Sequence, residues 1–106
     1  MHTSFVSVII TKNDEIVVIG IDESDGFSVI VKYDKDGNLL DESIYEQSAF
    51  ATVDEGPVGI VVTGIDEDYY GLALLYDDNF NIKWAKKILI LSQLIIFLIN
   101  IYHMFF

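Results

Sequence analysis

The segment IVVIGIDESDG, residues 16–26, returns almost unchanged as IVVTGIDEDYYG at residues 60–71. The offset is 44 positions, and at this offset Ser4 also meets Ser48. Removing one residue from the second loop continues the match at an offset of 43, which pairs Phe27, Val29, Val31 and Tyr33 with Tyr70, Leu72, Leu74 and Tyr76. Because apolar, turn and acidic positions agree together, the chain contains an internal repeat.

Each copy predicts four short strands. In the first copy these are residues 5–10, 16–21, 27–34 and 38–45, and in the second 49–53, 59–65, 70–77 and 81–88. Residues 16–21 form a continuous β-branched run, which is typical of a strand covered on both faces. Residues 27–34 alternate instead, with Phe27, Val29, Val31 and Tyr33 on one side and Ser28 and Lys32 on the other. Gly37 suits the hairpin turn that follows, and the more polar residues 38–45 favour an outer strand at a sheet edge.

Both copies resemble the blades of repeat-type β-propellers that occur in many prokaryotic cell-surface and secreted proteins. The shared pattern is Ile-Val-Val-x-Gly, an aromatic-led alternating strand ending in Tyr-Asp, and Asn-(Leu/Ile) before the last strand; it covers residues 4–88. The copies differ in their second turn, where Asn79-Phe80 stands for Asp36-Gly37. They also differ at Trp84, an aromatic that such blades often have in the outer strand, which corresponds to Asp41. The signature residues of WD-type or sugar-enzyme propellers are missing.

The resemblance implies an all-β fold of two four-stranded antiparallel propeller-like blades. The expected domain spans residues 1–87, with repeats at about 4–46 and 48–88, and a hydrophobic tail follows at 88–106. Propeller rings need roughly 4–8 blades, and repeat units bury their faces only against neighbours. Two blades therefore leave two apolar sheet faces, which could be covered by further copies of the chain, by the tail, or by other blades of a longer propeller.

The tail, residues 88–106, reads ILILSQLIIFLINIYHMFF. Nineteen helical residues span about 28 Å, close to the hydrocarbon core of a bilayer, so the segment is expected to form a hydrophobic helix that is long enough to cross a membrane. Lys83, Lys86 and Lys87 precede it, which predicts a membrane protein whose acidic body faces the cytoplasm. Two alternatives stay open. The segment could be a partial third blade, since Ser92 follows Ser48 by 44 residues, or a frame-shifted end after a broken repeat.

Charge excludes one class of partner. The 106 residues include 17 carboxylates and six lysines or arginines, for a formal net charge of −11. Nucleic-acid binding depends on basic side chains that neutralise phosphates, so no nucleic-acid partner is expected.

The chain has no cysteine, which removes disulfides and thiolate chemistry. Its N-terminus lacks the basic region of a cleaved secretion signal.

No catalytic, cofactor-binding or metal-binding residues are predicted. The two histidines, His2 and His103, stand at opposite termini, and no phosphate loop or nucleophile motif is present. Residues 34–38 begin like a calcium loop, but Leu39 and Tyr45 occupy the places where such a loop needs glycine and glutamate. A hairpin turn accounts for this segment, so no calcium site is expected.

Acidic residues occupy the same loop of each copy: Asp22, Glu23 and Asp25 in the first, and Asp66, Glu67 and Asp68 in the second. In a closed propeller they would lie on one rim and could attract cations or a basic partner, but we interpret them as a solvated loop. Trp84 and Tyr69-Tyr70 are expected to pack within the blade rather than to form a ligand platform. The sequence thus predicts a non-enzymatic β-propeller-like interaction or structural module that self-associates or joins other blades, and that residues 88–106 could anchor in a membrane. The alternative is a truncated remnant of a larger propeller enzyme or binding protein, with no complete site of its own.

Overall fold

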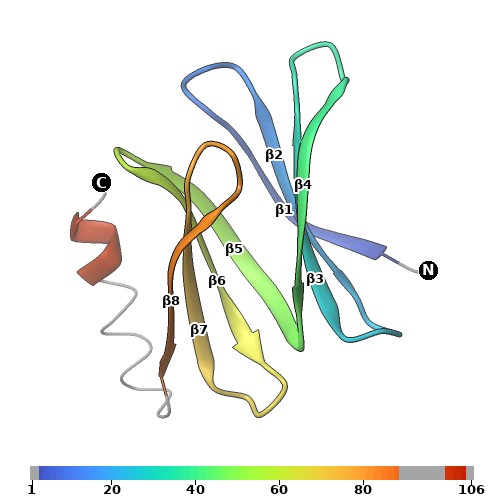
Figure 1. The fold of residues 1–106 in the computed structure, drawn as a ribbon, viewed down its shortest axis with the longest axis vertical. Coiled ribbons are helices and arrows are strands. Elements are labelled where there is room, and N and C mark those ends of the chain that lie inside the picture. The colour runs from blue at the N-terminus through green and yellow to red at the C-terminus, as the bar shows by residue number, and fades with distance from the viewer. Residues whose placement is uncertain (1–2, 89–99, 105–106) are drawn as a thin grey trace.

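The protein forms two four-stranded antiparallel sheets in a computed structural model that describes residues 3–88 and 100–104 (Figure 1). The first sheet contains β1 (Thr3–Ile10), β2 (Ile16–Asp22), β3 (Phe27–Tyr33) and β4 (Leu39–Glu46). The second contains β5 (Ser48–Gly56), β6 (Gly59–Asp66), β7 (Gly71–Tyr76) and β8 (Ile82–Ile88). In both sheets the strand order follows the chain order, so all eight predicted strands are confirmed, within a few residues at their ends.

The two sheets repeat each other down to their irregularities. A break in the register lies between Phe5 and Ser7 in the first sheet and between Phe50 and Thr52 in the second. A second break lies near the start of the outer strand in each, at Tyr33 and at Tyr76. Since bulges twist a sheet and re-aim its side chains, their repetition gives the two sheets a common shape.

The register corrects the repeat alignment in the first strand. Phe5 pairs with Gly20 and Phe50 pairs with Gly64, so the equivalent residues of β1 and β5 lie 45 positions apart rather than 44. Ser48 is accordingly the counterpart of Thr3 and not of Ser4. The difference arises because β1 and β2 are joined by residues 11–15, whereas only residues 57–58 join β5 and β6. Sequence similarity alone does not detect a one-residue slip between two apolar strands.

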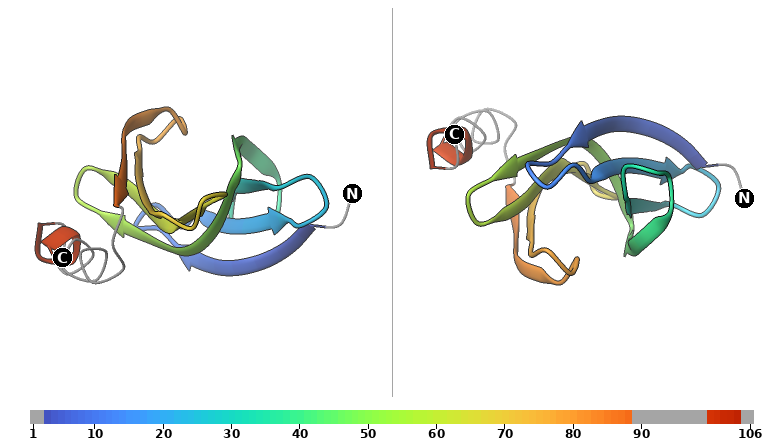
Figure 2. Two further views of the ribbon diagram at one scale, coloured as in Figure 1. Left: turned by 90° about the horizontal axis from the view of Figure 1, so that it is seen from below. Right: turned by 90° about the horizontal axis from the view of Figure 1, so that it is seen from above.

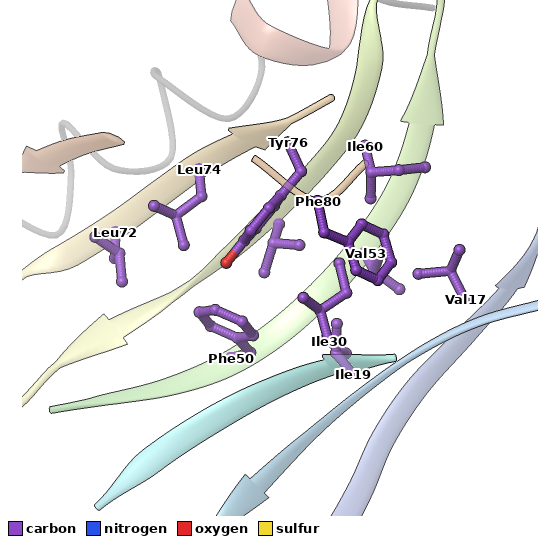
Figure 3. Packing of buried hydrophobic residues seen from close by; sticks show 11 residues of the cluster. Val17, Ile19, Ile30, Phe50, Val53, Ile60, Leu72, Leu74, Tyr76 and Phe80 are labelled. Carbon is purple, nitrogen blue, oxygen red and sulfur yellow. The ribbon is translucent and has the colours of Figure 1, made fainter. Parts of the chain in front are cut away.

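The core lies between the sheets, with β5 placed against β1, β2 and β3 (Figures 1 and 2). Figure 3 shows Phe50, Tyr76 and Phe80 of the second sheet pointing toward Ile19 and Ile30 of the first. The first sheet contributes the side of β3 that contains Ser28, Ile30 and Lys32, and all three side chains are buried. The side with Phe27, Val29, Val31 and Tyr33 points away from the second sheet and is half-buried, except for Val31, which is buried. The alternation predicted for β3 is therefore confirmed, and its more polar side is the one packed in the interface.

Phe80 reaches this core from the turn before β8. It has a φ of 60°, a left-handed conformation that its counterpart Gly37 adopts at 88°. A phenylalanine there is strained, because its Cβ crowds the backbone. Phe80 nevertheless is only 5% exposed and packs edge-on against Tyr76 at 6.0 Å between ring centroids. Burial of the ring offsets the strain of the backbone.

The predicted C-terminal hydrophobic helix falls largely on residues 89–99 and 105–106, outside the described part of the chain. Residues 100–104 form a single short helical segment. Within the described ranges, no helix is both long and apolar enough to cross a bilayer. The expected long hydrophobic helix thus has no support from the described residues.

Candidate interaction surface

The interface between the two sheets shows how one sheet of this chain binds another. Its apolar part joins Val17, Ile19 and Ile30 to the aromatic and aliphatic side chains of the second sheet. Near the link between β4 and β5, the Ser28 hydroxyl oxygen, fully buried, accepts hydrogen bonds from the Phe50 N–H and the Ser48 hydroxyl, each at 2.9 Å. These bonds satisfy donors that burial would otherwise strand.

Lys32 spans the same interface. Its ammonium group donates a hydrogen bond to the Asp78 carbonyl oxygen, lies 3.8 Å from a Glu15 carboxylate oxygen and stands 4.9 Å from the centre of the Phe80 ring. A lysine that is only 7% exposed needs such partners, because burying an unpaired charge is costly. Lys32 therefore fixes the relative position of the two sheets at one end of the interface.

A single buried hydroxyl in the interface has no partner. The Tyr76 hydroxyl is fully buried and makes no hydrogen bond with the described residues. Burial, with a smaller contribution from the nearby Tyr45, raises the pKa of Tyr76 well above the ordinary value for tyrosine. The hydroxyl therefore stays protonated and is a local cost to stability.

The face of the first sheet that points away from the second sheet is apolar and exposed. Phe5 is 65% exposed, Val8 59% and Ile44 58%. We call this surface the open face. The side chains on its side of the strands include Thr3, Phe5, Val8, Ile10, Ile16, Val18, Phe27, Val29, Val31, Tyr33, Leu39, Glu42, Ile44 and Glu46. A shallow hollow of about 540 Å³ lies on it, lined mainly by Phe5, Phe27, Val29, Val31 and Ile44.

The open face is the repeat counterpart of the second sheet's buried face. The strand pairing matches Phe5 with Phe50 and Val8 with Val53, and the partners in the second sheet are only 2% and 7% exposed. Likewise Tyr33 corresponds to Tyr76, which is fully buried. Large exposed apolar patches mark interaction sites. The open face is therefore the candidate functional surface of the described chain.

The far side of the second sheet differs because the short helix at residues 100–104, which we call the C-terminal segment, lies on it. Ile101 is 5% exposed and packs against Val61, Ala73 and Leu75, with Trp84 at the edge of the cluster. We call this surface the covered face; its strands also present Thr63, Ile65 and Lys86 on the same side. Packing was the expectation for Trp84, and that expectation is confirmed.

Each acidic loop begins with a buried aspartate at the end of β2 or β6, and the carboxylate of that aspartate accepts hydrogen bonds from the turn. Asp22 and Asp66 are 1% and 7% exposed, so the expectation of a solvated loop is wrong for these two residues. The carboxylate of Asp22 accepts hydrogen bonds from the Ser24 hydroxyl and N–H and from the Asp25 N–H, and these bonds lower its pKa. Glu23, Asp25, Glu67 and Asp68 are exposed as expected.

Asp66 has one partner that Asp22 lacks. Its carboxylate accepts hydrogen bonds from the N–H groups of Asp68 and Tyr70, and its other oxygen lies 3.0 Å from the Lys87 ammonium. Burial acts to raise the pKa of Asp66, but Lys87 and the two N–H donors outweigh it, and the net pKa is lowered. Ile44 takes the place of Lys87 in the first sheet, so one Asp22 oxygen is buried without a partner in the described structure.

The remaining sequence candidates form no reactive arrangement. In the turns at residues 34–38 and 77–81, the carboxylates of Asp34 and Asp77 accept hydrogen bonds from N–H groups of the turn itself. Over residues 3–88 and 100–104, no three histidine, aspartate or glutamate side chains come close enough together to hold a metal ion. Tyr69, expected to pack, is 84% exposed and lines a hollow of about 400 Å³ beside both acidic loops.

Comparison with protein-family models, curated proteins and solved structures finds no match to this chain.

Proposed function

We propose that the protein is a non-enzymatic interaction module of β-propeller-like sheets, whose open face docks on another protein surface. A single observation supports this most strongly. At Phe5, Val8 and Tyr33 the open face repeats Phe50, Val53 and Tyr76 of the face that the same chain uses to bind a sheet. Four aspartate carboxylates have a structural role, because Asp22, Asp34, Asp66 and Asp77 accept hydrogen bonds from N–H groups of their own turns.

The energy of the exposed side chains supports the proposal. Phe5, Val8, Ile10, Leu39 and Ile44 are each more than half exposed. Full burial of such a side chain contributes about 1.5–3 kcal/mol, so covering the exposed parts of all five would contribute roughly 5–9 kcal/mol. Association costs about 4–15 kcal/mol in lost freedom. The open face is thus sufficient for a weak contact and needs added contacts for a tight one.

The absence of cysteine allows a direct test of whether the open face is covered in the cell. Val8→Cys places one thiol on the open face, and Val58→Cys places one in the turn between β5 and β6. Both valines are similarly exposed, at 59% and 51%. In dilute purified protein a maleimide should label both thiols quickly. In the cells that produce the protein, the thiol at position 8 should react at least ten times more slowly than the thiol at position 58.

Equal labelling of the two thiols in cells would contradict the proposal, because an interaction module must have its docking face covered when it acts. The comparison does not require that the partner be known. Denaturing the cell extract before labelling provides the control, since both thiols should then react at the same rate.

A remnant of a larger propeller is the second candidate, and the open face supports it as well, because a further sheet of the same kind would cover that face. Translation of the DNA on both sides of the coding segment in all frames tests this. Further copies of the Ile-Val-Val-x-Gly pattern, about 44 residues apart, are expected if the chain derives from a longer array. Flanking DNA without such copies would contradict it.

Membrane anchoring through residues 88–106 is a separate proposal that rests on the length and apolarity of that segment. The packing of Ile101 on the covered face supports the competing arrangement, in which the segment lies on the sheet. Fractionation without detergent distinguishes them. A membrane-anchored chain should sediment with membranes and resist extraction by carbonate, whereas a chain with its tail on the sheet should stay in the supernatant.

A further inference from the structure

We infer that the occupant of the open face is the covered face of a second copy of this chain, and that the C-terminal segment at Ile101 competes with that copy. This inference rests on the proposed function and names its partner. It follows from comparing which face each sheet uses in the intramolecular interface.

The intramolecular interface joins unlike faces. The first sheet uses the side with Val17 and Ile19, and the second sheet uses the side with Ile60 and Val62. The repeat matches Val17 with Val61 and Ile60 with Ile16. The covered face is therefore the counterpart of the first sheet's docking side, and the open face is the counterpart of the second sheet's docking side. One copy's covered face can thus meet another copy's open face in the arrangement already used within the chain.

Charge favours this pairing over a symmetric one. Lys86 lies on the covered face, is exposed, and makes no ion pair with the described residues. Glu42 lies on the open face, on the equivalent outer strand, and is also exposed and unpaired in the described structure. In head-to-tail docking Lys86 takes the place of Ser43 and Glu42 takes the place of Ala85, so the opposite charges lie on the two outer strands that flank one interface and attract each other across it. Two open faces packed symmetrically would instead place carboxylates of β4 near each other, which is unfavourable.

The covered face lacks several of the side chains that fill the contact within the chain. The covered face presents small side chains, Thr63 and Ala73, where the first sheet's docking side has Ile19 and Ile30. It adds Trp84 where the first sheet has Asp41. Gly71 replaces Ser28, so the hydrogen bond to the Phe50 N–H has no counterpart between copies. The contact between copies is therefore apolar and weaker than the one within the chain.

Head-to-tail contacts generate rings when the rotation closes. Propeller rings hold roughly 4–8 blades, so two-sheet chains would close as two to four copies. Every copy in a ring makes two contacts, which overcomes the weakness of a single one. Ile101 occupies the face that each contact needs, so displacement of the C-terminal segment limits assembly.

Five full-length variants test the inference by light scattering of the size-separated protein over a range of concentrations. Phe5→Asp puts a charge on the open face, and Ile65→Asp puts one on the covered face at a residue that is 36% exposed. Ile101→Asp and the milder Ile101→Ser release the C-terminal segment. Val58→Asp adds the same charge outside both faces and serves as the control.

Assembly to two, three or four copies is expected for the wild type and for Val58→Asp at high concentration. Ile101→Asp should assemble at a protein concentration at least tenfold lower than the wild type needs. Ile101→Ser should do the same and replaces it if the aspartate prevents folding. Phe5→Asp and Ile65→Asp should each stay single. Mixed together, these two blocked variants should form a pair and nothing larger, because each still has one complementary face.

Two results would overturn the inference. One is assembly of Ile65→Asp that equals the wild type while Phe5→Asp stays single, which would indicate symmetric packing of two open faces. The other is a single chain in every sample, including the Ile101 variants. In that case slow labelling of the thiol at position 8 in cells would still support the proposed interaction module, with a partner other than a second copy of this chain. Rapid labelling of that thiol in cells would contradict both this inference and the proposed function.

Discussion

Phe5 and Phe50 occupy the same place in the two sheets and have opposite environments. Each pairs across its strand with a glycine, Gly20 or Gly64, immediately before a break in the register. Phe5 is 65% exposed, whereas Phe50 is 2% exposed. The difference follows from position in the array, because the first sheet covers the Phe50 side of the second while no described segment covers the Phe5 side of the first.

Alanine substitution should separate the two phenylalanines by stability. Phe50→Ala removes a buried ring and should lower the free energy of unfolding by about 3–5 kcal/mol. Phe5→Ala removes a mostly exposed ring and should lower it by less than about 1 kcal/mol in dilute solution. Urea unfolding of both variants measures the difference. Equal losses would mean that the open face is covered within the single chain.

The glycines beneath these rings should tolerate alanine unequally. A Cβ at Gly64 would lie 2.8 Å from the Phe50 Cα, and backbone cannot move cheaply. A Cβ at Gly20 would lie 3.1 Å from the exposed Phe5 ring and 2.9 Å from the Ser4 carbonyl oxygen. Gly64→Ala should therefore cost about 1–3 kcal/mol or more, and Gly20→Ala less. Thermal unfolding ranks them, and a lower melting temperature for Gly20→Ala would contradict this reading of the sheets.

Removing the Tyr76 hydroxyl should not harm the protein. Because the group is buried without a partner in the described structure, Tyr76→Phe should leave the free energy of unfolding unchanged or raise it by up to about 1 kcal/mol. The counterpart Tyr33→Phe, at a half-buried position, should change little and serves as the control. Chemical denaturation checks both. A loss above about 1 kcal/mol in Tyr76→Phe would reveal a hydrogen bond to that hydroxyl.

Asp66 should make the stability depend on acid pH. Its folded pKa lies below the ordinary value of 3.8, so the charged form is favoured in the folded chain. The stability that it contributes is therefore fully present above about pH 4 and is lost as the pH falls through the lowered pKa. Asp66→Asn should be less stable than the wild type at pH 7, and the gap should narrow below pH 4.

Urea midpoints of the two proteins measured from pH 7 to pH 2 test this dependence. The exposed Asp68→Asn is a matched control that removes a neighbouring charge without breaking the ion pair with Lys87. A gap between Asp66→Asn and the wild type that stays constant over the whole range would contradict the assignment. It would show that the turn depends on the shape of the side chain and not on its charge.

Sequence reasoning succeeded where the signal is local. The eight strands follow from alternation and turn residues, since a pleated strand exposes successive side chains on opposite faces. The turns at Asp34 and Asp77 follow from Asx chemistry, in which a carboxylate accepts hydrogen bonds from N–H groups two and four residues ahead. The repeat also predicted correctly that the two sheets share one pattern.

The contacts between the sheets could not be predicted from the sequence in the same way. The sequence did not indicate the role of Phe80, because burial of its ring between the sheets is what offsets the strain of its positive φ. Lys32 was placed only on the more polar side of its strand, and the sequence did not indicate that it bridges the sheets through Asp78 and Phe80. The burial of Asp22 and Asp66 was missed because acidic loop residues are usually exposed.

The sequence by itself determined that this chain forms two copies of one four-stranded antiparallel sheet, because strand periodicity and turn chemistry depend only on neighbours in the chain. Tertiary structure alone decided which face of each sheet is buried, because a strand with apolar residues on both sides can pack either side inward. The stacking of the second sheet on the Ile19 side of the first left Phe5 and its neighbours exposed and buried Phe50. That choice, made by contacts between residues far apart in the chain, created the surface on which the proposed function depends.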